Sequence, residues 1–246
     1  MKREFNPDEP ELMDRPQPVS AELESDLQSL RRLNRYFGSY GLIRTFLRCW
    51  LQPGGTYRIL DLATASGDIP RMMVDWARKH SIILKIDAVD FQPSTLEIAR
   101  KLSGEYPEIN FLRGDARTFE DQLTYDFVHC SLALHHFSEL DAVRILRQMS
   151  ALSHDKVLVS DLERSLFTRW SVWLLTTLIF REPMTIHDAR LSARRAFSYR
   201  ELETLAQDAG WSNFGHRRFI PARQAIWLRK REIAPLPLDP ALDFAT

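Results

Sequence analysis

The sequence has few cysteines, no net charge and no apolar run of membrane length, and each absence excludes a class of protein. Only two of the 246 residues are cysteines, Cys49 and Cys130. They match no metal-ligand spacing, so we expect reduced thiols and no metal site. The 33 basic residues equal the 33 acidic ones, which argues against affinity for nucleic acid built on neutralising phosphates. The apolar run 170–180 is shorter than the roughly 20 residues that span a bilayer.

The N-terminal segment lacks the apolar core of a signal peptide. Residues 1–20 carry four prolines and several acids, so we predict an extended arm and a cytoplasmic protein. Two helices are expected next, over 21–37 and 40–51, because leucines recur there at helical spacing and glycines follow each segment. Residues 1–55 are therefore interpreted as an arm and a helical cap.

From Tyr57 onward short apolar runs alternate with helical segments, which predicts an α/β fold with a doubly wound, mainly parallel sheet. Two further strands near the C-terminus are expected to close this sheet as an antiparallel pair. The seven strands are predicted at 57–62, 82–90, 109–115, 125–134, 155–162, 212–220 and 223–230. The main domain is thus placed at 56–230, followed by a proline-rich tail at 231–246.

An insertion at about 164–197 separates the fifth strand from the last helix and strand pair. Its first part, 166–180, reads as an apolar helix that carries Phe167, Trp170 and Trp173, and its second part, 181–197, reads as a polar link. Such a segment beyond the sheet would make a lid over a hydrophobic ligand, together with the N-terminal helices. An ordinary core helix is the alternative.

The loop after the first strand, in "LDLATASGD", has only one glycine where nucleotide-binding loops usually carry two or three. Small side chains let the backbone approach a ligand, and a helix N-terminus with free N–H groups follows. Ala63 and Ala65 stand where glycines are common, so we expect negative φ angles at both. Gly67 is expected at the turn into the helix.

Three further strands end in polar side chains, and in a doubly wound sheet ligands bind beyond these ends. Asp90 follows the second strand and can accept hydrogen bonds from ribose hydroxyls. Asp115 follows the third strand, where it could meet an adenine amino group or simply belong to a surface turn. The fourth strand runs into "HCSLALHHF", which contains Ser131 and a histidine pair.

Together these loops resemble the successive motifs of the class I S-adenosylmethionine-dependent methyltransferases: "ILDLATASGD", "AVDFQPSTLEIAR", "LRGDAR" and "YDFVHCSLALHHF". The ubiquinone/menaquinone-biosynthesis type, with "LDLATGTGD" and "LHH", is the nearest variety. "ELMDRP", "NRYFG" and "LSARRAFSYREL" look like a bacterial subgroup, uncharacterised or acting in secondary metabolism. The resemblance implies the Rossmann-like methyltransferase fold and S-adenosylmethionine as cofactor. It assigns cofactor contacts to Asp61, Ala63, Gly67, Asp90, Phe91, Asp115, Ala116 and Ser131.

Two other enzyme classes fit less well. An NAD-dependent enzyme would use the first loop and Asp90 equally, but its fingerprint needs a third glycine that is absent here. Methyltransferases acting on DNA or RNA bases often carry an Asn/Asp-Pro-Pro-aromatic loop after the fourth strand, and this chain has "CSLALHH" instead. A nucleic-acid partner is therefore not expected.

The remaining candidates are bases for the methyl acceptor. A phenol gains from a base with a pKa near neutrality, and histidine is the natural choice. His135 and His136 are adjacent, so we expect only one of them to face the pocket; His187 in the lid is a second candidate. The sequence predicts methyl transfer to an oxygen or carbon of a hydrophobic, aromatic or polyketide-like small molecule. A non-catalytic S-adenosylmethionine-binding scaffold or sensor is the alternative, and a monomer and a homodimer both remain open.

Overall fold

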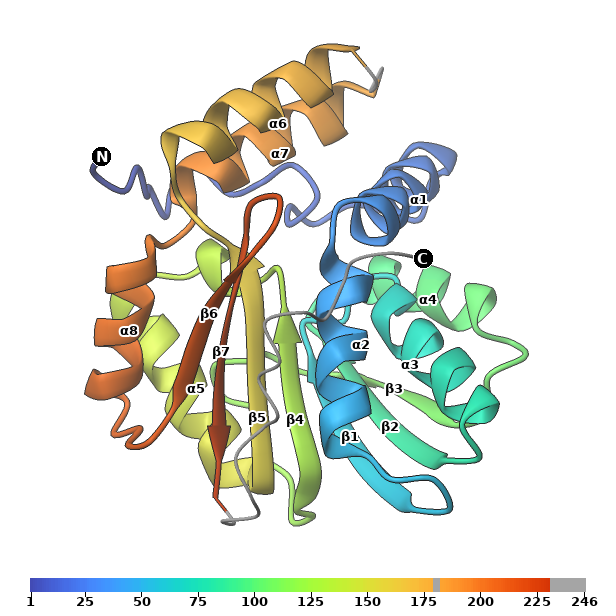
Figure 1. Ribbon diagram of the computed structural model, residues 1–246. Helices are drawn as coiled ribbons and strands as arrows, with labels where there is room; N and C mark the ends of the chain where they lie inside the picture. The colour runs from blue at the N-terminus through green and yellow to red at the C-terminus, as the bar shows by residue number, and fades with distance from the viewer. Residues whose placement is uncertain (179–181, 231–246) are drawn as a thin grey trace.

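Seven strands form one twisted sheet in the computed structural model, which describes residues 1–178 and 182–230 (Figure 1). The strand order is β3-β2-β1-β4-β5-β7-β6, with β1 to β5 parallel and β7 antiparallel to both β5 and β6. The predicted doubly wound sheet is confirmed. The strands are β1 (Thr56–Leu62), β2 (Ile83–Asp90), β3 (Ile109–Arg113), β4 (Tyr125–Ser131), β5 (Ser153–Leu162), β6 (Gly215–Phe219) and β7 (Arg223–Arg229).

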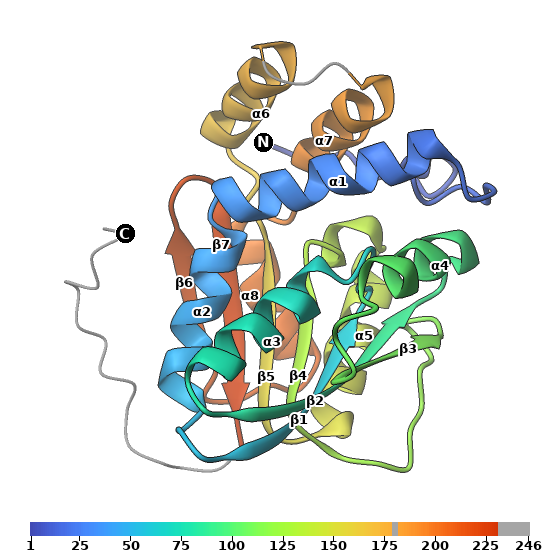
Figure 2. The ribbon, with the colours of Figure 1, turned by 90° about the vertical axis from the view of Figure 1, so that its right-hand side faces the viewer.

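The side chains of neighbouring residues in each central strand point to opposite faces of the sheet, because side chains alternate along a strand. Ile59 packs in one core and Leu60 in the other, and Phe127 and Val128 are divided in the same way. Helices cover both faces, as the turned view shows (Figure 2). One face carries α2 (Ser39–Trp50), α3 (Asp68–Lys79) and α4 (Pro93–Leu102), and the other carries α5 (Glu139–Leu152) and α8 (Tyr199–Asp208).

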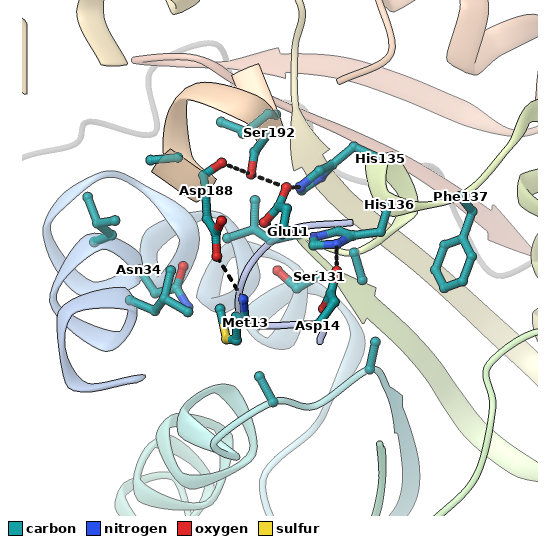
Figure 3. A pocket seen from close by; sticks show the side chains of 18 of the residues that line it. Glu11, Met13, Asp14, Asn34, Ser131, His135, His136, Phe137, Asp188 and Ser192 are labelled. Carbon is teal, nitrogen blue, oxygen red and sulfur yellow. Dashed lines mark hydrogen bonds and ion pairs between the residues drawn. The ribbon is translucent and has the colours of Figure 1, made fainter. Parts of the chain in front are cut away.

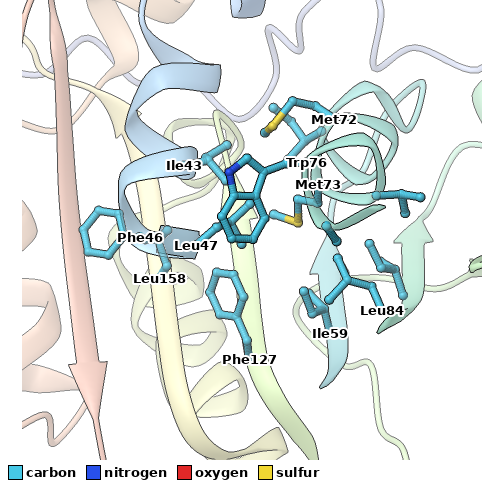
Figure 4. Close-up of a cluster of buried hydrophobic side chains, with 14 of the residues drawn as sticks. Ile43, Phe46, Leu47, Ile59, Met72, Met73, Trp76, Leu84, Phe127 and Leu158 are labelled. Carbon is cyan, nitrogen blue, oxygen red and sulfur yellow. The ribbon is translucent and has the colours of Figure 1, made fainter. Parts of the chain in front are cut away.

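Helix α2 packs on the sheet, although the sequence placed it with α1 in the helical cap. Its Phe46 and Trp50 rings meet edge to face at 4.9 Å, and Trp50 meets Phe127 of β4 at 5.1 Å. Figure 4 shows Leu47 near Trp76 of α3, whereas Phe46 points toward β7, where its ring centroid lies 5.1 Å from that of Trp227. Burying an aromatic side chain of this kind contributes about 1.5–3 kcal/mol, so α2 belongs to the folded core of the main domain.

A roof of helices lies beyond the carboxyl ends of the parallel strands (Figure 1). It consists of α1 (Ala21–Tyr36), α6 (Leu166–Leu178) and α7 (Pro183–Arg195), and α6 packs along α7. The short 3-10 helix η1 (Leu134–His136) follows β4 below this roof. Ser20 caps α1 by accepting a 3.1 Å hydrogen bond from the backbone N–H of Leu23, as its position before the leucine repeat predicts.

Helix α7 corrects the expectation of a polar link at 181–197. Pro183 stands in its first turn, where a proline is tolerated because no N–H is needed there. Its buried side is largely polar and includes Thr185, Asp188 and Ser192. Apolar periodicity, the usual sign of a helix, is therefore absent from this segment.

Parts of two expectations fall on residues that the structure does not describe. These are the end of the helix predicted at 166–180 and the tail at 231–246. Within 1–178 and 182–230, every helix is too short or too polar to cross a bilayer.

Candidate active site

A cavity of about 800 Å³ lies between the strand ends and the roof. Its floor comes from the loops after β1, β2, β3 and β4, and its walls come from the N-terminal arm, α1, α6 and α7. Figure 3 shows the wall that the arm and η1 share. This volume lies within the range of small-molecule sites, and the meeting of loops at the strand ends is where a doubly wound sheet binds its ligands.

The loop after β1 adopts left-handed backbone conformations at both alanines, which corrects the expected negative φ angles. Ala63 has φ 56° and Ala65 has φ 49°. The loop is fixed in this shape by hydrogen bonds from Thr64 N to Val89 O at 2.9 Å and from Ala65 N to the Asp90 carboxylate at 2.8 Å. A left-handed alanine costs about 1–2 kcal/mol. Leu132, after β4, is a third left-handed residue at this cavity, with φ 54°. Backbone strain therefore gathers where a ligand would lie.

Asp90 joins the first two loops at the floor of the cavity. Its carboxylate accepts backbone hydrogen bonds from Ala65 and, at 3.0 Å, from Gln92. Burial raises the pKa of Asp90, and these two hydrogen bonds oppose that rise. Each carboxylate oxygen still has a lone pair for a further donor. The hydroxyl of Thr64 is buried nearby without a hydrogen-bond partner among the described residues, so the floor has both a charged acceptor and an unused hydroxyl to offer a polar ligand.

Asp61 and Gly67, the two other cofactor candidates of the first loop region, differ in their position relative to the cavity. Asp61 lines the cavity, and its Oδ1 atom lies 2.6 Å from Nδ1 of the buried His129. Gly67 has φ 69° and lies outside the lining residues. A Cβ atom at Gly67 would lie 2.7 Å from ring carbons of Phe111. The glycine is therefore required by the turn and by this close approach, rather than by a ligand.

Phe91, Asp115, Ala116 and Ser131 all line the cavity. Phe91 is 48% exposed, so its ring is available for a flat ligand. Asp115 is held by Arg117, whose nitrogens approach it at 2.9 and 2.5 Å and keep the pKa of that carboxyl below its usual value. The Ser131 hydroxyl lies 2.8 Å from the hydroxyl of Ser160.

Both histidines after β4 face the same wall of the cavity, which corrects the expectation that only one of them would. The His135 and His136 rings lie 4.4 Å apart, centroid to centroid. Nδ1 of His135 lies 2.6 Å from Asp161, and Nδ1 of His136 lies 2.6 Å from Asp14. Both Nε2 atoms then face Glu11, at 3.8 Å from its two carboxylate oxygens (Figure 3). The tight 3-10 turn of η1 places both imidazoles on one side.

The electrostatics of this wall follow from burial and from the neighbouring charges. Burial lowers the pKa of His136, but Glu11 and Asp14 outweigh it and raise that pKa to about 10. Burial raises the pKa of Glu11, against the opposing effect of His136 and His135. The pKa of Asp161 stays below its ordinary value because His135 outweighs the cost of burying the carboxylate.

His187 is the one candidate base that the structure keeps out of the cavity lining. Its Nδ1 atom lies 2.8 Å from the Asp188 carboxylate, and its side chain is 39% exposed. Asp188 itself faces the cavity and accepts the backbone N–H groups of Leu12 and Met13 at 2.8 and 3.0 Å. The predicted extended arm is thereby fixed against α7.

The arm supplies residues that sequence reasoning missed. Glu11 and Asp14 belong to "ELMDRP", which was recognised as a motif without a role. Asn34, in "NRYFG", donates a 3.0 Å hydrogen bond to Asp68, and Tyr40 donates another at 3.1 Å. These contacts connect α1 and α2 to the first turn of α3. The sequence signal that could have identified Glu11 and Asp14 is the presence of two acids, three residues apart, in a proline-rich segment.

The lid helix α6 lines the cavity with Phe167, Trp170 and Leu174, among others. Trp173 is 51% exposed and does not belong to this lining. From α1, Leu27 and Leu30 add further apolar surface. The cavity is therefore polar at its floor and apolar under its roof.

Residues 59–155 match a family model described as a methyltransferase domain. An 80-residue stretch is 32% identical to 2-phytyl-1,4-naphtoquinone methyltransferase of Thermosynechococcus vestitus, covering 32% of this chain and only 34% of that relative's length. Among solved structures, the plantazolicin methyltransferase BamL, in complex with a triazolic desmethylPZN analog and SAH, has a TM-score of 0.64 at 12% identity, over 84% of this chain and 91% of that one. Human N-acetylserotonin methyltransferase, in complex with SAM, has a TM-score of 0.60 at 18% identity, over 84% and 55% of the two chains. At these identities the likeness shows a shared fold.

Proposed function

Residues 59–155 belong to the methyltransferase domain family of the class I S-adenosylmethionine-dependent enzymes, and from this premise we propose that the chain transfers a methyl group from S-adenosylmethionine to a small molecule. The acceptor is a hydrophobic, aromatic or polyketide-like compound, methylated on oxygen or carbon. The observation that carries the proposal is the cavity at the strand ends, which is polar at its floor and apolar under its roof.

The floor of the cavity suits the cofactor residue by residue. Asp90 would accept the ribose hydroxyls through the lone pairs that the backbone leaves free. Phe91 and Ala116 would lie against the adenine. Ala63 and Ser131 would border the methionine end, with Asp61 behind them, held by His129.

The roof suits an apolar acceptor. Phe167, Trp170 and Leu174 of α6 face the cavity opposite the strand ends, so that an aromatic ring would be removed from water beneath them. Bound S-adenosylmethionine supplies the electrophilic methyl group. Holding two reactants in line contributes about 7–11 kcal/mol to such a displacement, so positioning by the roof is the main contribution of this chain.

The methyl acceptor would lose its proton at the wall of the cavity that Glu11, His135 and His136 form. Asp161 and Asp14 hold both imidazoles by Nδ1, which directs both Nε2 atoms to the cavity side. An imidazole oriented by a carboxylate is a common arrangement for accepting a proton. His136, with its pKa raised to about 10, already carries a proton at neutral pH, so His135 is the proposed acceptor. His187 lies outside the cavity lining and has no place in this step.

Two experiments separate this proposal from its alternatives. Calorimetric titration with S-adenosylmethionine, S-adenosylhomocysteine and NAD should show binding of the first two alone; binding of NAD alone would overturn the proposal. The protein is then incubated with methyl-labelled cofactor and fractionated lipophilic compounds. Label in a small molecule supports transfer, whereas cofactor binding without any labelled product favours a non-catalytic scaffold or sensor.

A further inference from the structure

Four side chains from distant parts of the sequence converge at one wall of the cavity: Glu11, Asp14, His135 and His136 (Figure 3). Asp161 contacts His135 Nδ1, and we call the five side chains the imidazole–carboxylate cluster. The distance from each Nε2 atom to its Glu11 oxygen is 3.8 Å. A hydrogen bond between these atoms would be about 2.7–3.2 Å long. Two ligands of one transition-metal ion, each about 2.0–2.2 Å from it, can lie up to about 4 Å apart. The spacing is too wide for a hydrogen bond but suits a shared ion.

We propose that Glu11, His135 and His136 bind one divalent transition-metal ion, with the free coordination positions of that ion facing the cavity. Ligand atoms of the three side chains all lie within 4.8 Å of one another. Two ligands about 2.1 Å from a tetrahedral ion lie about 3.4 Å apart, so side-chain shifts that shorten these separations by up to about 1.4 Å would bring all three onto one ion. Two histidines and one carboxylate with open positions are a recognised metal-binding arrangement in enzymes.

The surroundings of the three ligands are those that metal-binding histidines require. Such a histidine donates its second ring N–H to a carboxylate, a carbonyl or water, which fixes its tautomer and orientation. Here Asp161 holds Nδ1 of His135 and Asp14 holds Nδ1 of His136, both at 2.6 Å. The Ser192 hydroxyl lies 2.7 Å from Glu11 Oε1 and orients the carboxylate.

The charge of the cluster also favours a cation. Glu11 and Asp161 are almost completely buried, with 3% and 2% of their surface exposed, and Asp14 is next to them. Three carboxylates in such a position need compensating positive charge, because burying an unpaired charge is costly. One divalent ion would supply it in place of the proton that His136 holds in the ion-free chain, and would leave both imidazoles neutral.

The ligand set also narrows the choice of ion. Imidazole suits zinc, iron, copper and nickel, whereas sites for magnesium and calcium are built from oxygen ligands. Zinc is therefore the first probe, and cobalt(II) is its spectroscopic substitute. The sequence predicted no metal site because two ligands are adjacent and the third lies more than a hundred residues away, a spacing that no metal motif has.

The inferred ion would hold an oxygen of the acceptor at the free position. Ion binding itself does not depend on methyl transfer, so the two proposals can fail separately. Should the ion not bind, His135 remains available as a direct proton acceptor for the proposed reaction.

The test measures ion binding to the full chain without turnover. Chelator-treated protein is equilibrated with zinc or cobalt(II), and bound metal is counted by plasma mass spectrometry after dialysis. We expect one ion per chain and visible absorption bands of bound cobalt. Glu11→Gln, which keeps the side-chain shape, and His136→Ala should remove saturable binding. Asp161→Asn should weaken it by about 10–100-fold, as expected for the loss of a partner that orients a ligand.

His187→Ala is the matched control, because it removes another histidine paired with an aspartate but outside the cavity lining. It should leave ion binding unchanged. Circular dichroism of each variant shows that the fold is retained; a variant that unfolds is replaced by Glu11→Asp, which shortens the ligand and should also weaken binding. Absence of saturable binding to the native chain would overturn the inference, as would equal binding by native protein, Glu11→Gln and His136→Ala.

Discussion

The backbone N–H of Ala65 donates a 2.8 Å hydrogen bond to the carboxylate of Asp90. One side chain thereby fixes the loop after β1 to the end of β2 and also borders the cavity. The acid at this position thus shapes the loop before any ligand arrives. This double role can be separated by substitution.

Asp90→Asn should weaken S-adenosylmethionine binding by about 10–100-fold, the equivalent of one charge-assisted hydrogen bond of about 1.5–3 kcal/mol. The amide keeps an oxygen for the Ala65 N–H, but its NH2 group replaces the oxygen that accepts the Gln92 N–H, and the charge offered to a ribose is lost. Asp115→Asn is the comparison. Arg117 already donates hydrogen bonds to the Asp115 carboxylate, so this substitution should weaken cofactor binding less. Calorimetry measures both affinities; an unchanged affinity for Asp90→Asn would remove Asp90 from the proposed site.

Ala65→Gly should raise the free energy of unfolding by about 0.5–1 kcal/mol. The left-handed φ of 49° costs an alanine more than the added flexibility of glycine costs the folded state. Ala77→Gly, inside α3, should lower the same quantity by about 1 kcal/mol because glycine is a poor helix former. Urea unfolding measures both, and two changes of the same sign would contradict the strain argument.

Gly67→Val should abolish cofactor binding and lower the unfolding free energy by more than about 2 kcal/mol. The new side chain would meet the Phe111 ring 2.7 Å from its Cβ atom, in a backbone conformation with φ 69°. Gly67→Ala should be milder, and Phe111→Leu should restore part of its loss by making room. If Phe111→Leu restores nothing, backbone strain alone explains the requirement for glycine.

Trp170→Ala should raise KM for the methyl acceptor more than it weakens cofactor binding, because Trp170 lines the apolar part of the cavity. Trp173→Ala removes an equal side chain from the same helix, but one that is half exposed and outside the lining, and KM should change little. Steady-state kinetics with one acceptor compare the two variants. Equal effects would show that α6 acts through its stability rather than through its cavity face.

Asp26→Asn should stabilise the fold at alkaline pH. Burial is the main cause that raises the pKa of Asp26 to about 6, opposed by a hydrogen bond from Thr185. The folded chain therefore keeps this proton up to about pH 6, whereas the unfolded chain releases it near pH 4. The carboxylate destabilises the fold above pH 6 by about 1–3 kcal/mol, and this cost disappears as the pH falls from 6 to 4.

The measurement is urea unfolding of native protein and Asp26→Asn at pH 8 and pH 4.5. The stability gained by the variant should be larger at pH 8. Asp8→Asn, a substitution of an exposed aspartate in the arm, serves as control and should show no such difference between the two pH values. A gain from Asp26→Asn that is the same at both pH values would exclude titration of Asp26 as its cause.

The sequence alone determined the sheet and the loops at its carboxyl end. Apolar runs of strand length alternate with helical segments, and this local pattern locates the parallel strands because the central ones, β1, β4 and β5, are buried on both faces. It also predicted that Asp90, Asp115, Ser131 and His135 would gather at one edge, since the carboxyl ends of parallel strands share that edge.

Only the tertiary structure decided what completes the cavity. Glu11 and Asp14 reach the histidines because Asp188 and Arg195 of α7 hold the arm by its backbone, an arrangement with no local signature. The polar buried side of α7 and the left-handed alanines were hidden for the same reason. Contacts between segments more than a hundred residues apart outweighed the local preferences of each segment, so the wall that faces the ligand emerged only from folding.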